Sequence, residues 1–239
     1  MLRERSFLAV IPARAGSVRI AGKNLRPLAG APLIAHTLRA ALESRHLDHV
    51  VVSTDGDEIA MVAGEYGVDV IMRPAELAGP TARSVDAVLH AIATVDGSFS
   101  DVVLLQPTSP LRTARHVDEA IEMYVARAAR SLLSVCPTRS LRYLRHVDGD
   151  GDARLVAADG PDGQDEETFT LNGAVYINEV ASLTPDTVMN ENRLAFVMDE
   201  MSSVDVDEPR DLAVAELFMG LRQQADVTGR AADAAAVLS

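Results

Sequence analysis

Residues 10–25 read VIPARAGSVRIAGKNL, and this stretch decides how the rest of the chain is interpreted. An apolar run, Phe7–Ile11, leads into it, and small residues then alternate with the cations Arg14, Arg19 and Lys23. Small residues let the backbone approach a ligand, and glycine allows positive-φ turns that aim successive N–H groups at one point. The stretch therefore predicts a strand followed by a loop that binds a polyphosphate.

The charge around this loop supports the same interpretation. No Asp or Glu occurs between Ser6 and Leu42, although the chain has 35 acidic residues and a net charge of −13. An electropositive region inside an acidic protein favours an anionic ligand. The alternative is an ordinary strand-to-helix loop that carries its arginines by chance.

The composition bounds the class of protein. A chain of 239 residues that is 48 % hydrophobic has room for one large α/β domain or two small ones. Its acidity argues against nucleic acid or an anionic membrane as a partner, and no apolar run has the length of a signal peptide or a membrane span. The single cysteine, Cys136, excludes an internal disulfide and a cysteine-built metal cage. We expect a soluble, cytoplasmic enzyme.

Short β-rich runs alternate with helical patterns, which is typical of a mainly parallel sheet covered by helices. Strands are expected at Phe7–Ile11, His49–Ser53, Val68–Met72, Asp101–Gln106, Ser131–Cys136, Asn172–Asn178, Leu194–Met198 and Val204–Val206. Helices are expected at 32–44, 57–66, 84–94, 113–129 and 209–223. The most apolar strand, Asp101–Gln106, is expected at the centre of the sheet. Residues 147–167, with eight acids, are expected to form an exposed excursion, and the Ala-rich tail a frayed helix or a disordered end.

Asp205 and Asp207 are the strongest acidic candidates for chemistry. On an extended chain, residues two apart project to the same side, and hard carboxylate oxygens presented together suit Mg²⁺ held jointly with phosphates. The alternative is a polar segment that caps the helix beginning near Pro209. Spacing alone leaves both interpretations open.

Other motifs give weaker evidence for a binding site. The run Asp148, Asp150, Asp152 fails as a calcium loop because its sixth position would be Ala153 and its twelfth Asp159. No G-x-G-x-x-G or Walker pattern follows the first strand, which counts against a dinucleotide cofactor and a P-loop.

In combination, several stretches are similar to one family, the acylneuraminate cytidylyltransferases, which make CMP-sialic acid. They are IPARAGS, GKNLRPLAGAPLIAHT, VVVSTD, MRPAELAG, VLLQPTSPLRT, NGAVYIN and SVDVD, between residues 10 and 207. The resemblance implies a Rossmann-like nucleotide-diphospho-sugar transferase α/β three-layer sandwich. It also implies a Mg²⁺-dependent reaction, with CTP and a small acidic acceptor as substrates. Residues 1–222 would be one cytidylyltransferase domain, 138–199 a lobe that forms a homodimer, and 223–239 a tail.

The resemblance also implies roles for individual residues. Arg14, Arg19, Lys23 and Asp207 would be catalytic, and Asp205 with Asp207 would hold the metal. The nucleotide would be bound by Ala13, Arg14, Ala15, Gly16, Lys23, Asn24, Arg73 and Ser84. The acceptor would be bound by Gln106, Arg142, Asn172 and Tyr176. In the reaction, an acceptor oxygen attacks the α-phosphorus of CTP and pyrophosphate leaves.

The chain departs from the family pattern at three places. Ser17-Val18-Arg19 stands where the family has Ser-Lys-Gly, and we expect Arg19 to take the place of that lysine. Arg142 replaces a lysine of the dimer lobe, and Thr170 replaces an arginine near the acceptor. The nucleotide half thus matches the family and the acceptor half departs from it. A nonulosonic or related keto-acid sugar is the first expectation for the acceptor. A small phosphonate is the alternative acceptor. The alternative to an active transferase is a catalytically inactive nucleotide-binding homologue.

Overall fold

The computed structural model describes residues 4–79, 81–138, 145–147, 153–155 and 168–237, and its main feature is a seven-stranded sheet. The strand order is β11-β7-β10-β6-β1-β4-β5. The bounds are β1 Phe7–Pro12, β4 His49–Thr54, β5 Asp69–Met72, β6 Asp101–Leu104, β7 Ser131–Thr138, β10 Thr168–Glu179 and β11 Leu194–Val197. Among these strands β10 alone runs antiparallel to its neighbours. The mainly parallel sheet is confirmed, and β6 lies in its middle as its apolar sequence predicts.

The helices form a layer on each face of the sheet. On one face, α1 (Leu33–Leu42), α2 (Asp57–Glu65) and α4 (Ala114–Ala126) pack against alternate residues of the strands, such as Ala9 and Ile11. On the other face, α3 (Ser84–Thr94) packs against the residues between them, such as Leu8 and Val10. Both faces of β1 are therefore buried, which is why its sequence is a continuous apolar run.

Two short hairpins lie outside the main sheet. β2 (Pro27–Leu28) pairs with β3 (Ala31–Pro32), and β8 (Arg145–Val147) pairs with β9 (Ala153–Leu155). The rest of the acidic excursion expected at 147–167 lies outside the described residues.

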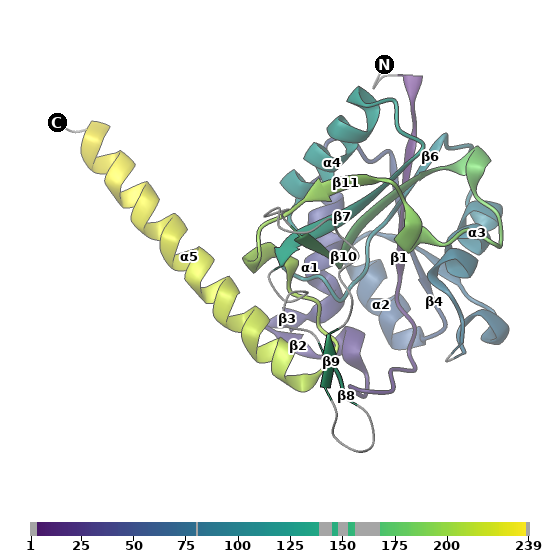
Figure 1. Ribbon diagram of the computed structural model, residues 1–239, viewed down its shortest axis with the longest axis horizontal. Coiled ribbons are helices and arrows are strands. Elements are labelled where there is room, and N and C mark those ends of the chain that lie inside the picture. Colours follow the sequence, from purple (N-terminus) through teal and green to yellow (C-terminus); the bar gives the residue numbers. More distant parts are fainter. Residues whose placement is uncertain (1–3, 80, 139–144, 148–152, 156–167, 238–239) are drawn as a thin grey trace.

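The C-terminal helix α5, Pro209–Val237, packs against the body at its first turns and then projects away from it (Figure 1). Ala215 of α5 is buried in a small apolar cluster with Ile20, Leu28, Leu33, Leu111 and Val206. The helix is longer than the expected 209–223 and continues into the Ala-rich tail. No helix among the described residues has the length and apolarity that crossing a membrane requires.

The strand expected at Val204–Val206 is wrong. The 3₁₀ turn η7, Met201–Ser203, precedes this segment, which stays outside the sheet and is tied to the body by the Val206 amide, 2.7 Å from the Thr108 carbonyl oxygen. Val206 is apolar because it enters the cluster at the base of α5, so a β-rich sequence here reflects burial without strand pairing.

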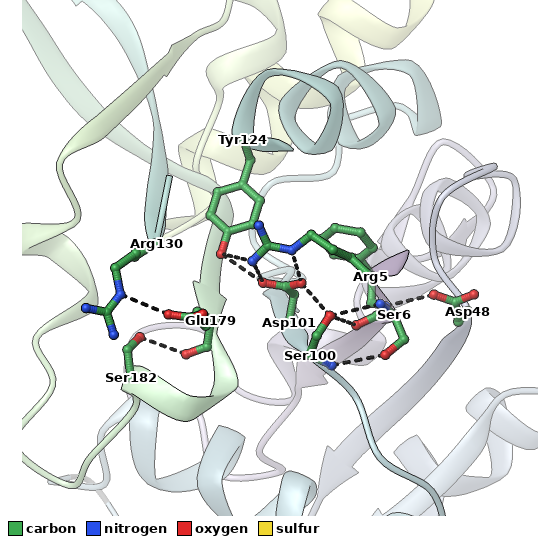
Figure 2. Close-up of polar contacts among 10 residues, drawn as sticks. Arg5, Ser6, Asp48, Ser100, Asp101, Tyr124, Arg130, Glu179 and Ser182 are labelled. Atoms are coloured by element: carbon green, nitrogen blue, oxygen red, sulfur yellow. Dashed lines mark hydrogen bonds and ion pairs between the residues drawn. The ribbon is translucent and has the colours of Figure 1, made fainter. Parts of the chain in front are cut away.

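The amino ends of β1 and β6 are joined by a network of paired charges, which Figure 2 shows. The carboxylate of Asp101 is fully buried and accepts hydrogen bonds from Arg5, Ser100 and Tyr124. Tyr124 comes from α4, so the network fixes a helix and two strands at the end of the sheet opposite to the loop after β1.

Candidate active site

A cleft of about 370 Å³ opens at the carboxyl ends of the parallel strands, where open α/β sheets place their ligands. Its lining comes from the loop after β1, the segments before α3 and after β6, and the segment before α5. The lining residues are Pro12, Arg14, Ser17, Val18, Arg19, Lys23, Asn24, Arg73, Ala82, Arg83, Ser84, Gln106, Pro107, Thr108, Asp205 and Asp207. Five cations and two carboxylates are among these described residues, so the cleft is electropositive inside an acidic protein.

Hydrogen bonds to neighbouring segments hold the loop after β1 in place. The Arg14 carbonyl accepts from the buried Asn24 amide at 3.0 Å, and the Arg14 guanidinium donates to the Gly79 carbonyl at 3.1 Å. The Ala15 amide donates to the Asp55 carboxylate at 2.8 Å. Positive φ occurs here at Gly22, with φ 61°, whereas Gly16 does not need it. The cations of the loop are thus presented by a backbone with a defined course.

The loop meets the acidic segment directly. Lys23 Nζ lies 3.1 Å from Asp207 Oδ1 and donates to the Val206 carbonyl at 2.9 Å. Arg19 NH1 lies 3.0 Å from Asp207 Oδ2. The sequence prediction that this loop and the two aspartates share one cleft agrees with this geometry, although more than 180 residues separate Lys23 from Asp207 along the chain.

Asp205 lies next to Thr108 and close to the charges of Asp207 and Lys23. The Thr108 hydroxyl donates a hydrogen bond to it, but surrounding protein and the neighbouring charge of Asp207 together raise its pKa above the ordinary value. A Cβ on Gly173 would lie 2.7 Å from Gln106 Oε1 and 3.9 Å from Asp205 Oδ2. Gly173 has φ 71°, so its missing side chain leaves the room that the Gln106 amide occupies beside Asp205.

Arg73 forms part of the cleft wall and is 8 % exposed. It donates to the Ser53 and Leu77 carbonyls at 2.6 and 3.1 Å, while its Nε is buried without a partner in the described structure. Burial lowers the pKa of Arg73, and the nearby charge of Arg14 lowers it further. Such a rigid cation, with one donor left over, suits a wall that contacts a polar ligand.

Several residues expected to bind substrates do not line the cleft. Ala13 is buried in the wall, its amide bonded to the Ser53 carbonyl, and Ala15 and Gly16 lie in the same loop without facing the cleft. Gln106 and Ser84 do line it. Arg142 lies outside the described residues.

The two expected acceptor ligands on β10 are committed elsewhere. The Asn172 amide oxygen accepts from the Ser134 hydroxyl at 2.6 Å, and its nitrogen donates to the Ser203 hydroxyl at 2.9 Å. The Tyr176 hydroxyl is 3.0 Å from the Asn190 amide oxygen, and Tyr176 is 5 % exposed. Asn172 positions the backbone after Gly173, because its amide oxygen also accepts from the Ala174 amide at 3.2 Å, and neither Asn172 nor Tyr176 lines the cleft.

Other cleft residues carried no assigned role in the sequence. The sequence signal for Thr108 is its place in PTSPLR, and the signals for Arg83 and Ser17 are their neighbours Ser84 and Gly16. Beneath the cleft, the buried Arg112 donates to the Gln106 and Ala174 carbonyls at 3.2 and 2.7 Å. Full burial lowers its pKa to about 9, and it joins the end of β6 to β10 from below.

The donor set fits a hard divalent cation that is shared with a ligand. The described residues contain no cluster of three or more His, Cys, Asp or Glu side chains able to hold a metal. Asp205 and Asp207 both line the cleft and would supply two carboxylate ligands, and Mg²⁺ bound through two carboxylates takes its other oxygens from water and phosphates. The charge of Asp207 is one of the causes that raise the pKa of Asp205, so the two carboxylates repel each other, and a cation bound to both would relieve this repulsion.

Comparison with known proteins identifies relatives over most of the chain. The family model described as cytidylyltransferase matches residues 8–173. The CMP-N,N'-diacetyllegionaminic acid synthase of Legionella pneumophila is 37 % identical over 236 residues, covering 92 % of this chain and 98 % of the relative. The N-acylneuraminate cytidylyltransferase of Escherichia coli is 33 % identical over 216 residues, covering 87 % of this chain. The chain spans about half of that longer protein, 51 %.

Solved structures share the fold. A CMP:2-keto-3-deoxy-manno-octonic acid synthetase complexed with CTP matches with a TM-score of 0.70 at 19 % identity, over 91 % of this chain and 99 % of that one. The 4-diphosphocytidyl-2C-methyl-D-erythritol synthase of Anaerococcus prevotii matches with a TM-score of 0.64 at 13 % identity, over 92 % and 98 %. The fold is that of the nucleotide-diphospho-sugar transferases, as the sequence predicts.

Proposed function

The chain belongs to the cytidylyltransferase family, and on this premise we propose that it transfers CMP from CTP to a nonulosonic acid, releasing pyrophosphate. The observation that carries the proposal is the cleft in which Arg14, Arg19 and Lys23 face Asp205 and Asp207. The relative from Legionella, matched over nearly its full length, favours a nonulosonic acid as the acceptor.

The cations of the cleft would bind and orient the triphosphate. In the reaction an acceptor hydroxyl oxygen forms a bond to the α-phosphorus, and the bond from that phosphorus to the bridging oxygen breaks. Pyrophosphate leaves with the electron pair, and the hydroxyl proton passes to solvent. Arg14, Arg19 and Lys23 would stabilise the charge that develops on the leaving group, which fixed cations do without reorganisation.

Asp205 and Asp207 would hold Mg²⁺, which would supply charge neutralisation at the phosphates when bound. Arg73 and Ser84 would flank the nucleotide, while Gln106 would face the acceptor from beside Gly173. Arg112 donates to the Gln106 backbone carbonyl and would thereby keep the Gln106 side-chain amide in place at the end of β6.

We also infer a homodimer built through residues 138–199. Phe169 and Leu171 on β10 are 37 % and 41 % exposed, and large apolar side chains at the rim of a sheet favour a protein partner. Light scattering of the purified chain measures the mass of the assembly directly, and a monomeric mass at micromolar concentration would contradict the homodimer. The use of CTP favours the cytoplasm as the place of action.

Pyrophosphate release with CTP and a panel of acids tests the function. The panel holds N,N'-diacetyllegionaminic acid, N-acetylneuraminic acid, 2-keto-3-deoxy-manno-octonic acid and a small phosphonate, and mass spectrometry identifies each CMP conjugate. We expect turnover with a nonulosonic acid and none without an acceptor. Turnover with the phosphonate alone would redirect the acceptor assignment, and tight CTP binding without turnover on any acid would indicate an inactive homologue.

A further inference from the structure

Both oxygens of the Asp207 carboxylate already have a cationic partner. Arg19 lies 3.0 Å from Oδ2 and Lys23 lies 3.1 Å from Oδ1. These are two of the cations that a triphosphate would need, and Asp207 is one of the two carboxylates that a metal would need. Two cations and one carboxylate of the cleft thus pair with each other across the site.

Packing sets Arg19 and Asp207 opposite each other. Ile20, which follows Arg19, and Val206, which precedes Asp207, are 5 % and 0 % exposed in the same apolar cluster at the base of α5. Burying these two neighbours together brings the adjacent charged residues into contact, so the contact follows from the core of the protein.

The two partners differ in their freedom to move. The amide of Asp207 donates to the Asp211 carboxylate at 2.9 Å, and the Glu208 amide donates to the same oxygen at 2.7 Å, which fixes the backbone where α5 begins. The Arg19 side chain is 61 % exposed on a long flexible stem, whereas that of Asp207 is 39 % exposed. When a stronger anion enters, the arginine can therefore leave while the carboxylate stays in place.

Resting on the proposed function, we propose that Arg19 occupies Asp207 until a polyphosphate binds. Arg19 and Lys23 then exchange the carboxylate for phosphate oxygens and leave Asp207 free for the divalent cation. The nucleotide-free chain binds the cation weakly, and polyphosphate and cation strengthen each other's binding. Because coupling between two ligands is reciprocal, each must raise the affinity of the other by the same factor.

The first experiment measures Mn²⁺ binding to the nucleotide-free chain by electron paramagnetic resonance. The variants are Arg19→Gln and, as a control of equal charge change, Arg83→Gln. Arg83 lines the same cleft but pairs with Asp86 at 2.7 Å. Since exposed ion pairs are weak, we expect Arg19→Gln to tighten Mn²⁺ binding about threefold. Arg83→Gln should have a smaller effect, and circular dichroism verifies the fold of both.

Equal tightening in both variants would mean that cleft charge alone is responsible and would overturn the proposal. Unchanged binding in Arg19→Gln, or no Mn²⁺ binding in either variant, would overturn it as well.

A second experiment reads the exchange from the anion side. Calorimetry measures binding of inorganic tripolyphosphate in excess EDTA to Asp207→Asn and to Asp205→Asn. Each variant removes one negative charge from the cleft, but Asp207→Asn also releases Arg19 and Lys23. We expect the tighter binding in Asp207→Asn, and equal affinities would contradict the exchange. Neither experiment involves turnover, so failure of the acceptor panel would defeat the proposed function without altering these outcomes.

Discussion

The two ends of β1 carry charge in opposite ways. At the amino end, the buried Asp101 is surrounded by donors from Arg5, Ser100 and Tyr124, and its charge is compensated within the chain (Figure 2). At the carboxyl end, five cations face two carboxylates across an open cleft of about 370 Å³. One strand thus connects a network in which the charges are paired to a cleft in which cations outnumber carboxylates.

The difference separates stability from function. Compensated buried charge is costly to disturb, because removing one partner leaves the others desolvated and unpaired. Excess positive charge in a cleft lowers the stability of the fold. It serves function when an anionic ligand binds and pairs with it. Substitutions at the amino end should therefore destabilise the protein, and substitutions at the carboxyl end should inactivate it while it stays folded.

The largest expected effect is that of Asp207→Asn on turnover. If Asp207 holds the metal as proposed, losing its carboxylate should lower kcat/KM about 1000-fold, or about 4 kcal/mol of transition-state stabilisation. The midpoint of thermal unfolding should stay nearly unchanged, because Asp207 is half-exposed. Glu208→Gln is the matched control, since Glu208 pairs with the exposed Arg210 outside the cleft. Retained activity and Mg²⁺ dependence in Asp207→Asn would refute the metal assignment.

Asp101→Ala should produce the reverse pattern. It leaves Arg5 and Tyr124 without their shared acceptor, and we expect the free energy of unfolding to fall by about 3 kcal/mol. Urea denaturation followed by circular dichroism measures this. The fraction that remains folded should bind CTP with unchanged affinity, as calorimetry can verify. A stable Asp101→Ala protein with weakened CTP binding would invert the comparison between the two ends.

Much of this arrangement follows from local sequence. The apolar runs place β1 and β6 in the centre, and the acid-free loop with Arg14 and Lys23 predicts the anion site. Asp205 and Asp207 are predicted as a pair because residues two apart on extended backbone face the same way. These features depend on periodicity and local charge, which a sequence displays directly.

What the sequence does not display depends on contacts between distant segments. The contact of Arg19 with Asp207 requires Ile20 and Val206 to enter one apolar cluster. Asn172 was expected at the acceptor, but Ser134 and Ser203 bond its amide. The strand expected at 204–206 failed for a similar reason, since apolar residues can be buried without pairing in a sheet.

Gly173→Ala should have an intermediate effect that combines both patterns. Its Cβ would approach Gln106 Oε1 to 2.7 Å and displace that amide from beside Asp205. We expect kcat/KM for the acceptor to fall about tenfold, or about 1.4 kcal/mol. The positive φ adds a stability cost of about 1 kcal/mol. Steady-state kinetics with varied acceptor measures the first, and thermal unfolding the second.

Gly67→Ala is the matched control for this substitution. Gly67 has the same φ of 71°, but a Cβ there would meet nothing within 4 Å. It should lose the same stability and retain full activity. Equal kinetic losses in the two variants would show that the backbone penalty, and not the displaced amide, is responsible.

The smallest expected effect concerns a third group of charges, around Asp118 on α4. Burial opposes ionisation of this carboxyl group, but hydrogen bonds from Arg45 and Ser44 outweigh it and lower its pKa below the ordinary 3.8. A carboxyl group whose pKa is lower in the folded state stabilises the fold above its unfolded pKa, and this contribution is lost as the pH falls through the folded value.

Asp118→Asn should therefore lower the free energy of unfolding by about 1 kcal/mol at pH 7. At pH 3 and below, its curve should approach that of the wild type. Glu119→Gln, which removes the adjacent and more exposed carboxylate, should leave the curve unchanged. If Asp118→Asn remained equally destabilised across the acid range, packing at α4 and not paired charge would be the cause. The rule that compensated charge stabilises the fold, drawn from the two ends of β1, would then not hold for this helix.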